Sequence, residues 1–158
     1  MRVYTDASTR KISGLGYIAT DAKHNVVKKQ GVVIDQPDNN TAELQAIIYG
    51  IDETQPLLQK NENVTIFTDS TYAINAIRNN VYREGEEPLV KKIQHLMTYA
   101  NYKLMWIKGH CQDGTVLSYY NKKVDKLAKT ARSEYEKELI KEKRIKRLIK
   151  QGKRNEYE

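Results

Sequence analysis

Two acidic residues of this chain stand directly after segments with the composition of β-strands. Asp6 follows the β-branched and aromatic run Val3-Tyr4-Thr5, and Asp69 follows a similar run over 63–67. In α/β sheets, reactive groups gather at the carboxyl ends of strands. If these two strands are parallel neighbours, their ends lie about 5 Å apart. We therefore expect Asp6 and Asp69 to point into one crevice.

Glu43 and Asp125 complete a set of four carboxylates, each expected in the first turn or an early position of a helix that follows a loop. Such a cluster is costly by itself, because like charges at short range disfavour joint ionisation. Hard divalent cations remove that cost, and a ligand set made only of oxygen favours Mg²⁺ or Mn²⁺. Two such ions about 4 Å apart can hold the attacking and leaving oxygens of a phosphoryl transfer. The four acids together indicate this chemistry.

Three of these acids also have a purely local explanation. Asp6 can open a turn, Glu43 is favourable near a helix N-terminus, and Asp69 can cap the helix that follows it. Their joint arrangement, rather than any single position, favours a metal site.

The hydrophobic pattern predicts an α/β chain of order βββαβααβα, with helices packed over a partly antiparallel sheet. The first three strand-like segments have no helix between them, which indicates antiparallel pairing. The apolar positions Leu44, Ile47 and Ile51 then follow helical spacing. The expected strands cover 1–7, 14–20, 25–34, 63–67 and 103–108. The expected helices begin at Thr41 as N-cap, Thr71, Pro88 and Asn121, with a loop over 111–120.

Gly14 and Gly16 do not form a dinucleotide-binding fingerprint, because no third glycine follows and no helix opens there. We expect them to allow close backbone approach inside the sheet. Trp106, the only tryptophan, is expected in the core.

Composition limits the class of protein. The 158 residues, 39% of them apolar and 30% charged, correspond to about one domain. No apolar run could span a bilayer, and no signal peptide precedes the first strand-like segment. Cys111 is the single cysteine, which excludes an intrachain disulfide, and with three histidines it leaves too few ligands for a typical structural zinc site. We expect a cytoplasmic protein with no membrane partner.

The net charge is concentrated near the C-terminus. Residues 141–154 hold eight Lys or Arg and one acid, so this segment carries 8 − 1 = +7, the net charge of the whole chain. From Ser133 onward the sequence is nearly all helix formers with a thin apolar stripe, which predicts either a projecting helix or a segment that is disordered when free. The charge suits an anionic partner, while a solvated helix face and a protein partner are the alternatives.

Five motifs, in order, resemble type 1 ribonuclease H over about residues 1–132. They are Thr5-Asp6-Ala7-Ser8, Asn39-Asn40-Thr41-Ala42-Glu43-Leu44, Thr68-Asp69-Ser70-Thr71-Tyr72, Trp106-Ile107-Lys108-Gly109-His110, and Asn121 with Asp125, Leu127 and Ala128. The resemblance implies a ribonuclease H-like catalytic domain over 1–132, a five-stranded mixed sheet in the order 3-2-1-4-5 with helices on both faces. A basic extension over 133–158 would follow. The implied activity is metal-dependent hydrolysis of the RNA strand of an RNA/DNA hybrid to 5′-phosphate and 3′-hydroxyl ends.

The resemblance also implies residue roles. Asp6, Glu43, Asp69 and Asp125 would be catalytic ligands of two Mg²⁺ ions, with Mn²⁺ as an alternative. His110 would be the family's mobile catalytic histidine, which is thought to assist proton transfer or product release. The implied partner is an RNA/DNA hybrid, bound by a monomer with no stable protein partner. The implied substrate-binding residues are Ser8, Asn39, Asn40, Thr71 and Asn121.

Three features depart from the family pattern. Ala7 stands where glycine is common, and the segment 111–120 lengthens the link that follows His110. The segment 79–88 is short and acidic where many bacterial relatives carry a basic helix and loop that grips the duplex. We expect the basic C-terminal segment to replace that grip. The expected phosphate contacts are Lys143, Arg144, Lys146, Arg147 and Lys150.

Two other functions share this fold. A DNA-directed nuclease, such as a resolvase or transposase core, is disfavoured by Asn39-Asn40 and Gly109-His110, which those groups generally lack. A hybrid- or DNA-binding module with weak catalysis is disfavoured because all four acids are retained. A cysteine nuclease using Cys111 with its neighbour His110 is also disfavoured, since adjacent loop residues rarely reach productive hydrogen-bond geometry.

Overall fold

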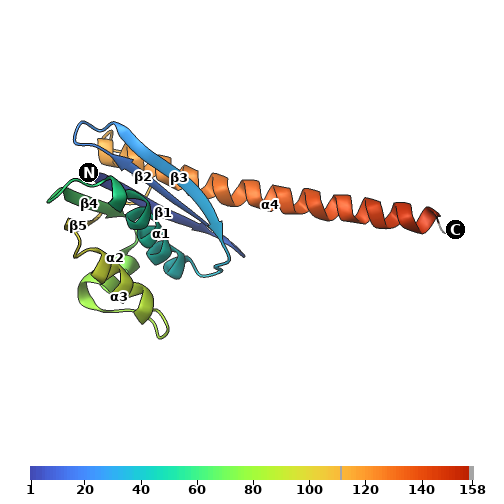
Figure 1. The fold of residues 1–158 in the computed structure, drawn as a ribbon, viewed down its shortest axis with the longest axis horizontal. Coiled ribbons are helices and arrows are strands. Elements are labelled where there is room, and N and C mark those ends of the chain that lie inside the picture. Colours follow the sequence, from blue (N-terminus) through green and yellow to red (C-terminus); the bar gives the residue numbers. More distant parts are fainter. Residues whose placement is uncertain (111, 157–158) are drawn as a thin grey trace.

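The computed structural model describes residues 1–110 and 112–156, so Cys111 lies outside the described residues. Five strands form one mixed sheet in the order β3-β2-β1-β4-β5, which confirms the predicted order (Figure 1). The pairs β1–β2 and β2–β3 are antiparallel, whereas β1–β4 and β4–β5 are parallel. The strands are β1 (Arg2–Thr9), β2 (Ser13–Thr20), β3 (Val26–Ile34), β4 (Asn63–Thr68) and β5 (Asn101–Trp106).

Helices cover both faces of this sheet (Figure 1). Val3 of β1 packs in a core cluster with Leu44 of α1, whereas its neighbour Tyr4 packs in another cluster with Val124 of α4. Successive strand residues point to opposite faces, so α1 and α4 lie on opposite sides of β1. The helices are α1 (Asn39–Thr54), η1 (Gln55–Leu57, a 3₁₀ turn), α2 (Thr71–Asn79), α3 (Glu87–Leu96) and α4 (Val116–Glu156).

α1 begins three residues earlier than predicted. The N-cap is Asp38 rather than Thr41, because the Asp38 carboxylate accepts a hydrogen bond from the Thr41 backbone N–H (2.9 Å). Asp is at least as strong an N-cap as Thr. Asn39 and Asn40 therefore lie in the first turn of the helix and not in the loop that precedes it.

α4 also begins earlier, at Val116 rather than Asn121. The Thr115 hydroxyl accepts a hydrogen bond from the Ser118 backbone N–H (3.2 Å), the arrangement of an N-cap side chain. The loop that joins β5 to α4 is consequently shorter than the predicted loop over 111–120. β5 is also displaced relative to the predicted strand over 103–108 and ends at Trp106.

The glycines of β2 let α4 approach the sheet closely. A Cβ atom at Gly14 would lie 2.0 Å from the Ala128 carbonyl oxygen, and one at Gly16 would lie 3.2 Å from the Val124 carbonyl oxygen. The close approach predicted for this pair of glycines therefore occurs between the sheet and the helix above it. It fixes the height and direction of α4.

α4 continues without interruption far beyond the sheet. Arg132 is the last buried residue among the described side chains of α4, and the helix runs on to Glu156 as a projection from the body (Figure 1). Residues 133–156 are thus helical, one of the two states predicted for this segment. In the described part of the chain, every helix is too short or too polar to cross a membrane.

We predict that Gly14→Ala lowers the free energy of unfolding by about 1–3 kcal/mol, the usual cost of overpacking, since the new methyl group meets the α4 backbone. Gly152→Ala is the matched control, because open space surrounds this exposed helical glycine. The control should raise helix stability by roughly 1 kcal/mol or less. Chemical denaturation followed by circular dichroism measures both changes, and equal effects of the two substitutions would contradict the close packing.

Candidate active site

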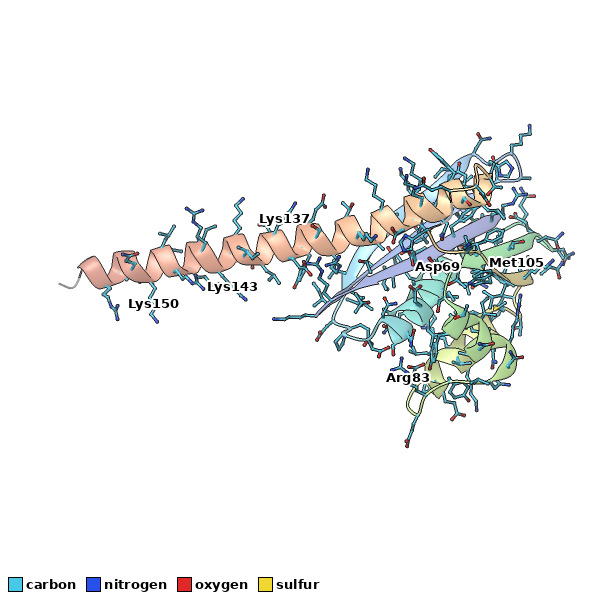
Figure 2. All side chains as sticks on the ribbon, turned by 180° about the vertical axis from the view of Figure 1, so that it is seen from behind. Asp69, Arg83, Met105, Lys137, Lys143 and Lys150 are labelled. Atoms are coloured by element: carbon cyan, nitrogen blue, oxygen red, sulfur yellow. The ribbon has the colours of Figure 1, made fainter. Side chains whose placement is uncertain are left out.

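Three of the four predicted carboxylates meet at one place. Asp6 of β1, Glu43 of α1 and Asp69 after β4 each offer an oxygen atom, and these atoms lie within 4.8 Å of one another. Asp6 and Glu43 are only 3% and 4% exposed, and Asp69 is half-buried (labelled in Figure 2). The three residues are 26 to 63 positions apart in sequence, and the fold alone brings them together.

Strand register explains the meeting of Asp6 and Asp69. The parallel pairing of β1 with β4 matches Tyr4 with Phe67, and each aspartate follows two residues later. Asp6 lies within β1, and Asp69 is the first residue after β4. Parallel strands end at the same edge of a sheet, so both side chains reach the same edge. Glu43 lies on the second turn of α1, between the buried Ala42 and Leu44, rather than in the first turn as predicted.

Asp125 approaches the cluster from the other face of the sheet. It lies in the tenth position of α4, not in an early position, because the helix begins at Val116. Its carboxylate is close enough to raise the pKa of Asp6 through both charge repulsion and a side-chain hydrogen bond. Its Oδ2 also pairs with Lys129 Nζ at 2.9 Å. Asp125 therefore borders the cluster of three carboxylates through its contact with Asp6.

Burial and mutual repulsion raise the pKa values of the cluster. Burial raises the pKa of Glu43 to about 8, and the nearby charge of Asp69 adds to this effect. The pKa of Asp6 is raised well above its usual range by burial and then by the charge of Glu43. Burial is also the main reason for the raised pKa of Asp69. Without a compensating cation, the site disfavours full ionisation.

The donor set fits a hard divalent cation. All ligand atoms are carboxylate oxygens, which Mg²⁺ and Mn²⁺ prefer. Glu43 Oε2 is buried and has no hydrogen-bond partner among the described residues, so one lone pair is left for another ligand. A cation would also remove the repulsion that raises these pKa values.

Asp69 is held by contacts to its backbone and side chain. Trp106 Nε1 donates a hydrogen bond to the Asp69 carbonyl oxygen (3.1 Å). Trp106 is 47% exposed, so its predicted place in the core is wrong. The alternative in which Asp69 caps α2 is wrong as well, because Ser70 is the N-cap and accepts a hydrogen bond from the Ala73 N–H (3.0 Å). A Cβ at Gly109 would lie 3.0 Å from Asp69 Oδ2, which leaves the carboxylate little room on that side.

A cavity of about 120 Å³ opens beside Asp69. His110 lines this cavity, although the link that follows it over 111–120 is longer than the family pattern. The early start of α4 takes up part of that link. Asn121 is 4% exposed and hydrogen-bonds Asp69, while its Oδ1 has no partner among the described residues. The lining residues are Asp69, His110, Gln112, Asn121, Lys122 and Asp125.

Gln112 and Lys122 were missed by the sequence analysis. Lys122 had a signal, because it precedes Asp125 by three residues and therefore shares its side of the helix. Gln112 had none, because nothing in the loop sequence fixes which side chains turn toward the cavity.

The other predicted substrate-binding residues lie in different settings. Asn39 and Thr71 are exposed in the first turns of α1 and α2, and Asn40 is partly exposed beside Asn39. Ser8, by contrast, is buried, and its hydroxyl accepts a hydrogen bond from Arg132 Nε (3.1 Å). The structure thus gives Ser8 a visible role in docking α4 onto β1.

Glu86 ties the start of α1 to α2, a link that the sequence did not reveal. Its buried carboxylate accepts hydrogen bonds from the Thr41 hydroxyl (3.0 Å) and the Tyr72 hydroxyl (2.5 Å). Arg83 pairs with Glu86 (3.6 Å) and with Asp38 (2.8 Å). This network holds the two helix N-termini, which carry the predicted substrate-binding residues, at a fixed separation.

The fold and site together define a class of protein. A mixed sheet in the order 3-2-1-4-5, with helices on both faces and carboxylates gathered at one strand edge, is the ribonuclease H-like architecture. The RNase H family model matches residues 1–133, and the chain belongs to this family.

Individual relatives are similar over most of the chain. Ribonuclease H of Schizosaccharomyces pombe is 29% identical over 153 residues, which cover 84% of this chain and 53% of that protein, so the chain spans about half of that relative's length. Ribonuclease H of Clostridium botulinum is 27% identical, covering 84% of this chain and 95% of the relative. Ribonuclease H of Caldicellulosiruptor saccharolyticus is 31% identical over 126 residues, covering 70% and 84%.

Solved structures share the fold. The crystal structure of LC11-RNase H1 in complex with an RNA/DNA hybrid superposes with a TM-score of 0.70 at 21% identity, covering 82% of this chain and 94% of that chain. RNase H1 of Halobacterium salinarum gives a TM-score of 0.67 at 16% identity, covering 84% and 97%. At these identities the likeness is one of fold.

The raised pKa values predict a pH-dependent stability in the absence of divalent cations. The folded pKa of Glu43 is about 8, above the ordinary value of 4.5, so the folded state holds this proton more tightly. The contribution of Glu43 to the free energy of unfolding should therefore be greatest below about pH 4.5, and it should fall as pH rises toward 8. We expect Glu43→Gln to reduce this fall, on the order of 1 kcal/mol or more at pH 8.

Thermal unfolding in EDTA at a series of pH values measures the effect. Glu84→Gln is the control, because Glu84 is an exposed acid and its substitution should leave the pH profile unchanged. Added Mg²⁺ should raise the midpoint more at pH 8 than at pH 5, since its ligands must be deprotonated. A Glu43→Gln profile that overlays the wild-type profile would contradict the strained carboxylate cluster.

Proposed function

We propose that this chain is a ribonuclease H that hydrolyses the RNA strand of RNA/DNA hybrids to 5′-phosphate and 3′-hydroxyl ends by a two-metal-ion mechanism. The observation that carries the proposal is the meeting of Asp6, Glu43 and Asp69, whose oxygen atoms lie within 4.8 Å of one another. Membership of the RNase H family supports the substrate class. Mg²⁺ is the proposed ion, with Mn²⁺ as an alternative.

The four acids would hold the ions in this mechanism. Asp6, Glu43, Asp69 and Asp125 supply only oxygen ligands, and two bound ions would generate the attacking hydroxide and stabilise the leaving oxygen. Because the pKa of Glu43 is raised to about 8, the site without a cation keeps a proton on this residue near neutral pH. Ion binding would therefore release protons.

Residues of the neighbouring cavity would position the substrate and move protons. His110 lines the cavity beside Asp69 and Asp125, where its imidazole would assist proton transfer or product release. Asn121 holds Asp69 through its amide, and its Oδ1 faces no described partner. This orientation would keep the Asp69 carboxylate directed at the ions.

Selectivity for a hybrid requires the protein to distinguish RNA from DNA at the sugar. The 2′-hydroxyl both donates and accepts hydrogen bonds, and the side-chain amides of Asn39 and Asn40 can do the same. Both residues lie in the first turn of α1, with Thr71 at the start of α2. Contacts to sugar and phosphate carry little sequence information, so cleavage should show little sequence preference.

The decisive experiment compares four labelled substrates with and without Mg²⁺. We expect cleavage of the RNA strand of an RNA/DNA hybrid in the presence of Mg²⁺, and none of an RNA duplex, a DNA duplex or single-stranded RNA. Cleavage of the DNA duplex would instead support a DNA-directed nuclease. Binding of the hybrid without cleavage would support a binding module.

Asp69→Asn should abolish cleavage while hybrid binding survives, because a metal ligand is lost but few substrate contacts are. A loss of several kcal/mol of transition-state stabilisation corresponds to roughly 10³-fold or more in kcat. Asp52→Asn, which removes an exposed carboxylate from α1, should retain full activity. Kinetics and fluorescence anisotropy separate the two effects, and full cleavage by Asp69→Asn would eliminate the metal mechanism.

His110→Ala should cause a smaller loss of kcat than Asp69→Asn, of roughly 10²-fold, which is typical of a lost proton-transfer group. His95→Ala provides the control, since His95 is an exposed histidine on α3. Steady-state rates over a range of pH test the assignment. An unchanged rate for His110→Ala would make His110 an ordinary surface residue.

A further inference from the structure

The distal part of α4 is an exposed, strongly charged rod. Every side chain from Ile140 to Arg154 is exposed, and residues 141–154 carry the whole net charge of the protein. The helix leaves the sheet as a straight projection, with Lys137, Lys143 and Lys150 along it (Figure 2). Burial of an apolar face against the body does not explain this segment.

The direction of the projection is set by contacts with β1 and β2. Gly16, which pairs with Asp6, lies under Val124 and Ala128, and Gly14, which pairs with Ser8, lies under Ala128 and Arg132. α4 therefore runs toward the carboxyl end of β1. Beyond the sheet, it extends past the same edge at which Asp6 and Asp69 meet.

Most of the basic side chains lie on one side of this projection. An α-helix has 3.6 residues per turn, so positions 143, 146, 147, 150, 153 and 154 fall within a sector of about 120°. We call this sector the basic face. Its residues are Lys143, Lys146, Arg147, Lys150, Lys153 and Arg154.

The basic face is turned toward the side of α4 that bears the active site. Arg132 contacts Ser8 of β1, and Lys143 and Lys150 follow eleven and eighteen residues later, close to three and five whole turns. Lys143 also follows Asp125 by eighteen residues, so the two share a side of the helix. Figure 2 agrees, since Lys143 and Lys150 lie on the same side of α4 as Asp69, and Lys137 lies on the other.

We propose that the distal part of α4 is a duplex-binding arm, whose basic face binds phosphates of the hybrid about one duplex turn away from the scissile phosphate. The proposal rests on the proposed ribonuclease H function and names a second contact surface for the same substrate. At 1.5 Å per residue, Lys143 and Arg154 lie about 27 and 44 Å along the axis from Asp125. That span corresponds to roughly 8–13 base pairs of duplex at 3.4 Å per base pair.

Geometry separates the basic residues better than charge alone. Arg144, expected from sequence among the phosphate contacts, lies about 100° around the helix from Lys143, outside the basic face. Lys137 and Lys141 also point away from this face, whereas Lys153 and Arg154 join it. The arm therefore offers its own control, because three basic residues on the same helix point away from the site.

The test compares two triple variants of the full chain with equal charge change. Lys143→Gln, Lys146→Gln and Lys150→Gln remove half of the basic face. Lys137→Gln, Lys141→Gln and Arg144→Gln remove the same charge from the other side. All six positions are exposed, and Gln is close to Lys and Arg in helix propensity, so both proteins should fold; circular dichroism verifies this.

Each protein is assayed with hybrids that contain a single cleavage site and extend beyond it by about 6 or about 16 base pairs. The longer extension is placed on one side of the site in one hybrid and on the other side in another. For the wild type and the control, one of these two longer hybrids should bind at least about 10-fold tighter than the short hybrid. The basic-face variant should lose this gain while kcat and the affinity for the short hybrid stay unchanged. Its slope of log KM against log salt should be flatter by about 2–3, near 0.9 per lost phosphate contact.

Anisotropy measures binding even if no substrate is cleaved, so failure of the arm and failure of the nuclease function can be distinguished. Normal cleavage with no length effect, or equal losses in both triple variants, would overturn the arm and leave the nuclease function standing.

Sedimentation tests whether the exposed Ile145, Leu148 and Ile149 join two copies of the chain. The overturning result is a wild type that sediments as a dimer and a double variant, Ile145→Gln/Leu148→Gln, that loses both this dimer and the length effect. In that case the surface joins two copies of the chain, and the arm is overturned.

Discussion

The mutual repulsion of Asp6, Glu43 and Asp69 is the constraint around which the molecule is arranged. Each of these carboxylates would be more stable alone in water, and burial raises all three pKa values. The fold keeps them together because each is anchored by its own element. Asp6 is fixed by a central strand, Glu43 by a helix whose neighbouring residues are fully buried, and Asp69 by a strand end that Trp106 holds. The stability of the rest of the chain offsets the cost of burying these three carboxylates side by side.

The same central strand links both layers of the fold. β1 pairs with β2 on one side and β4 on the other, so it sets the register of Asp69 and supports α1 on one face and α4 on the other. The glycines of β2 then determine how deeply α4 sits. Asp125 reaches the cluster only because the helix lies this close to the sheet. The packing of uncharged glycines against the α4 backbone therefore helps to position a predicted ligand.

Much of this arrangement could be predicted from the sequence. Asp6 and Asp69 follow strand-like runs, and they are expected at one edge on the condition that the two strands are parallel neighbours. The sheet order that meets this condition is implied by the family resemblance, and the structure has it. Helix starts were less predictable, because several residues compete as caps: Asp38 prevails over Thr41, and α4 begins five residues before Asn121. Local patterns do not reveal contacts between distant segments.

Glu86 and Trp106 illustrate that limit. Glu86 bonds a threonine 45 positions away, so nothing around it in the sequence marks it as buried. Trp106 ends an edge strand, where only one neighbour covers it, and it is half exposed despite its apolar ring. The direction of the basic face depends on the rotation of α4 about its axis, which the sequence does not give. The contact of Arg132 with Ser8 fixes that rotation.

Because α4 is a single unbroken helix from Asp125 to its exposed end, rotation and length are coupled in it. Each inserted or deleted residue between positions 133 and 142 would turn everything beyond it by about 100° and shift it by about 1.5 Å. Only changes close to whole turns, such as seven, eleven or eighteen residues, would keep the lysines pointing as they do. Insertions and deletions in this segment should therefore be retained in evolution when they add or remove nearly whole helical turns. This constraint holds even though none of the outer residues is packed against the described body.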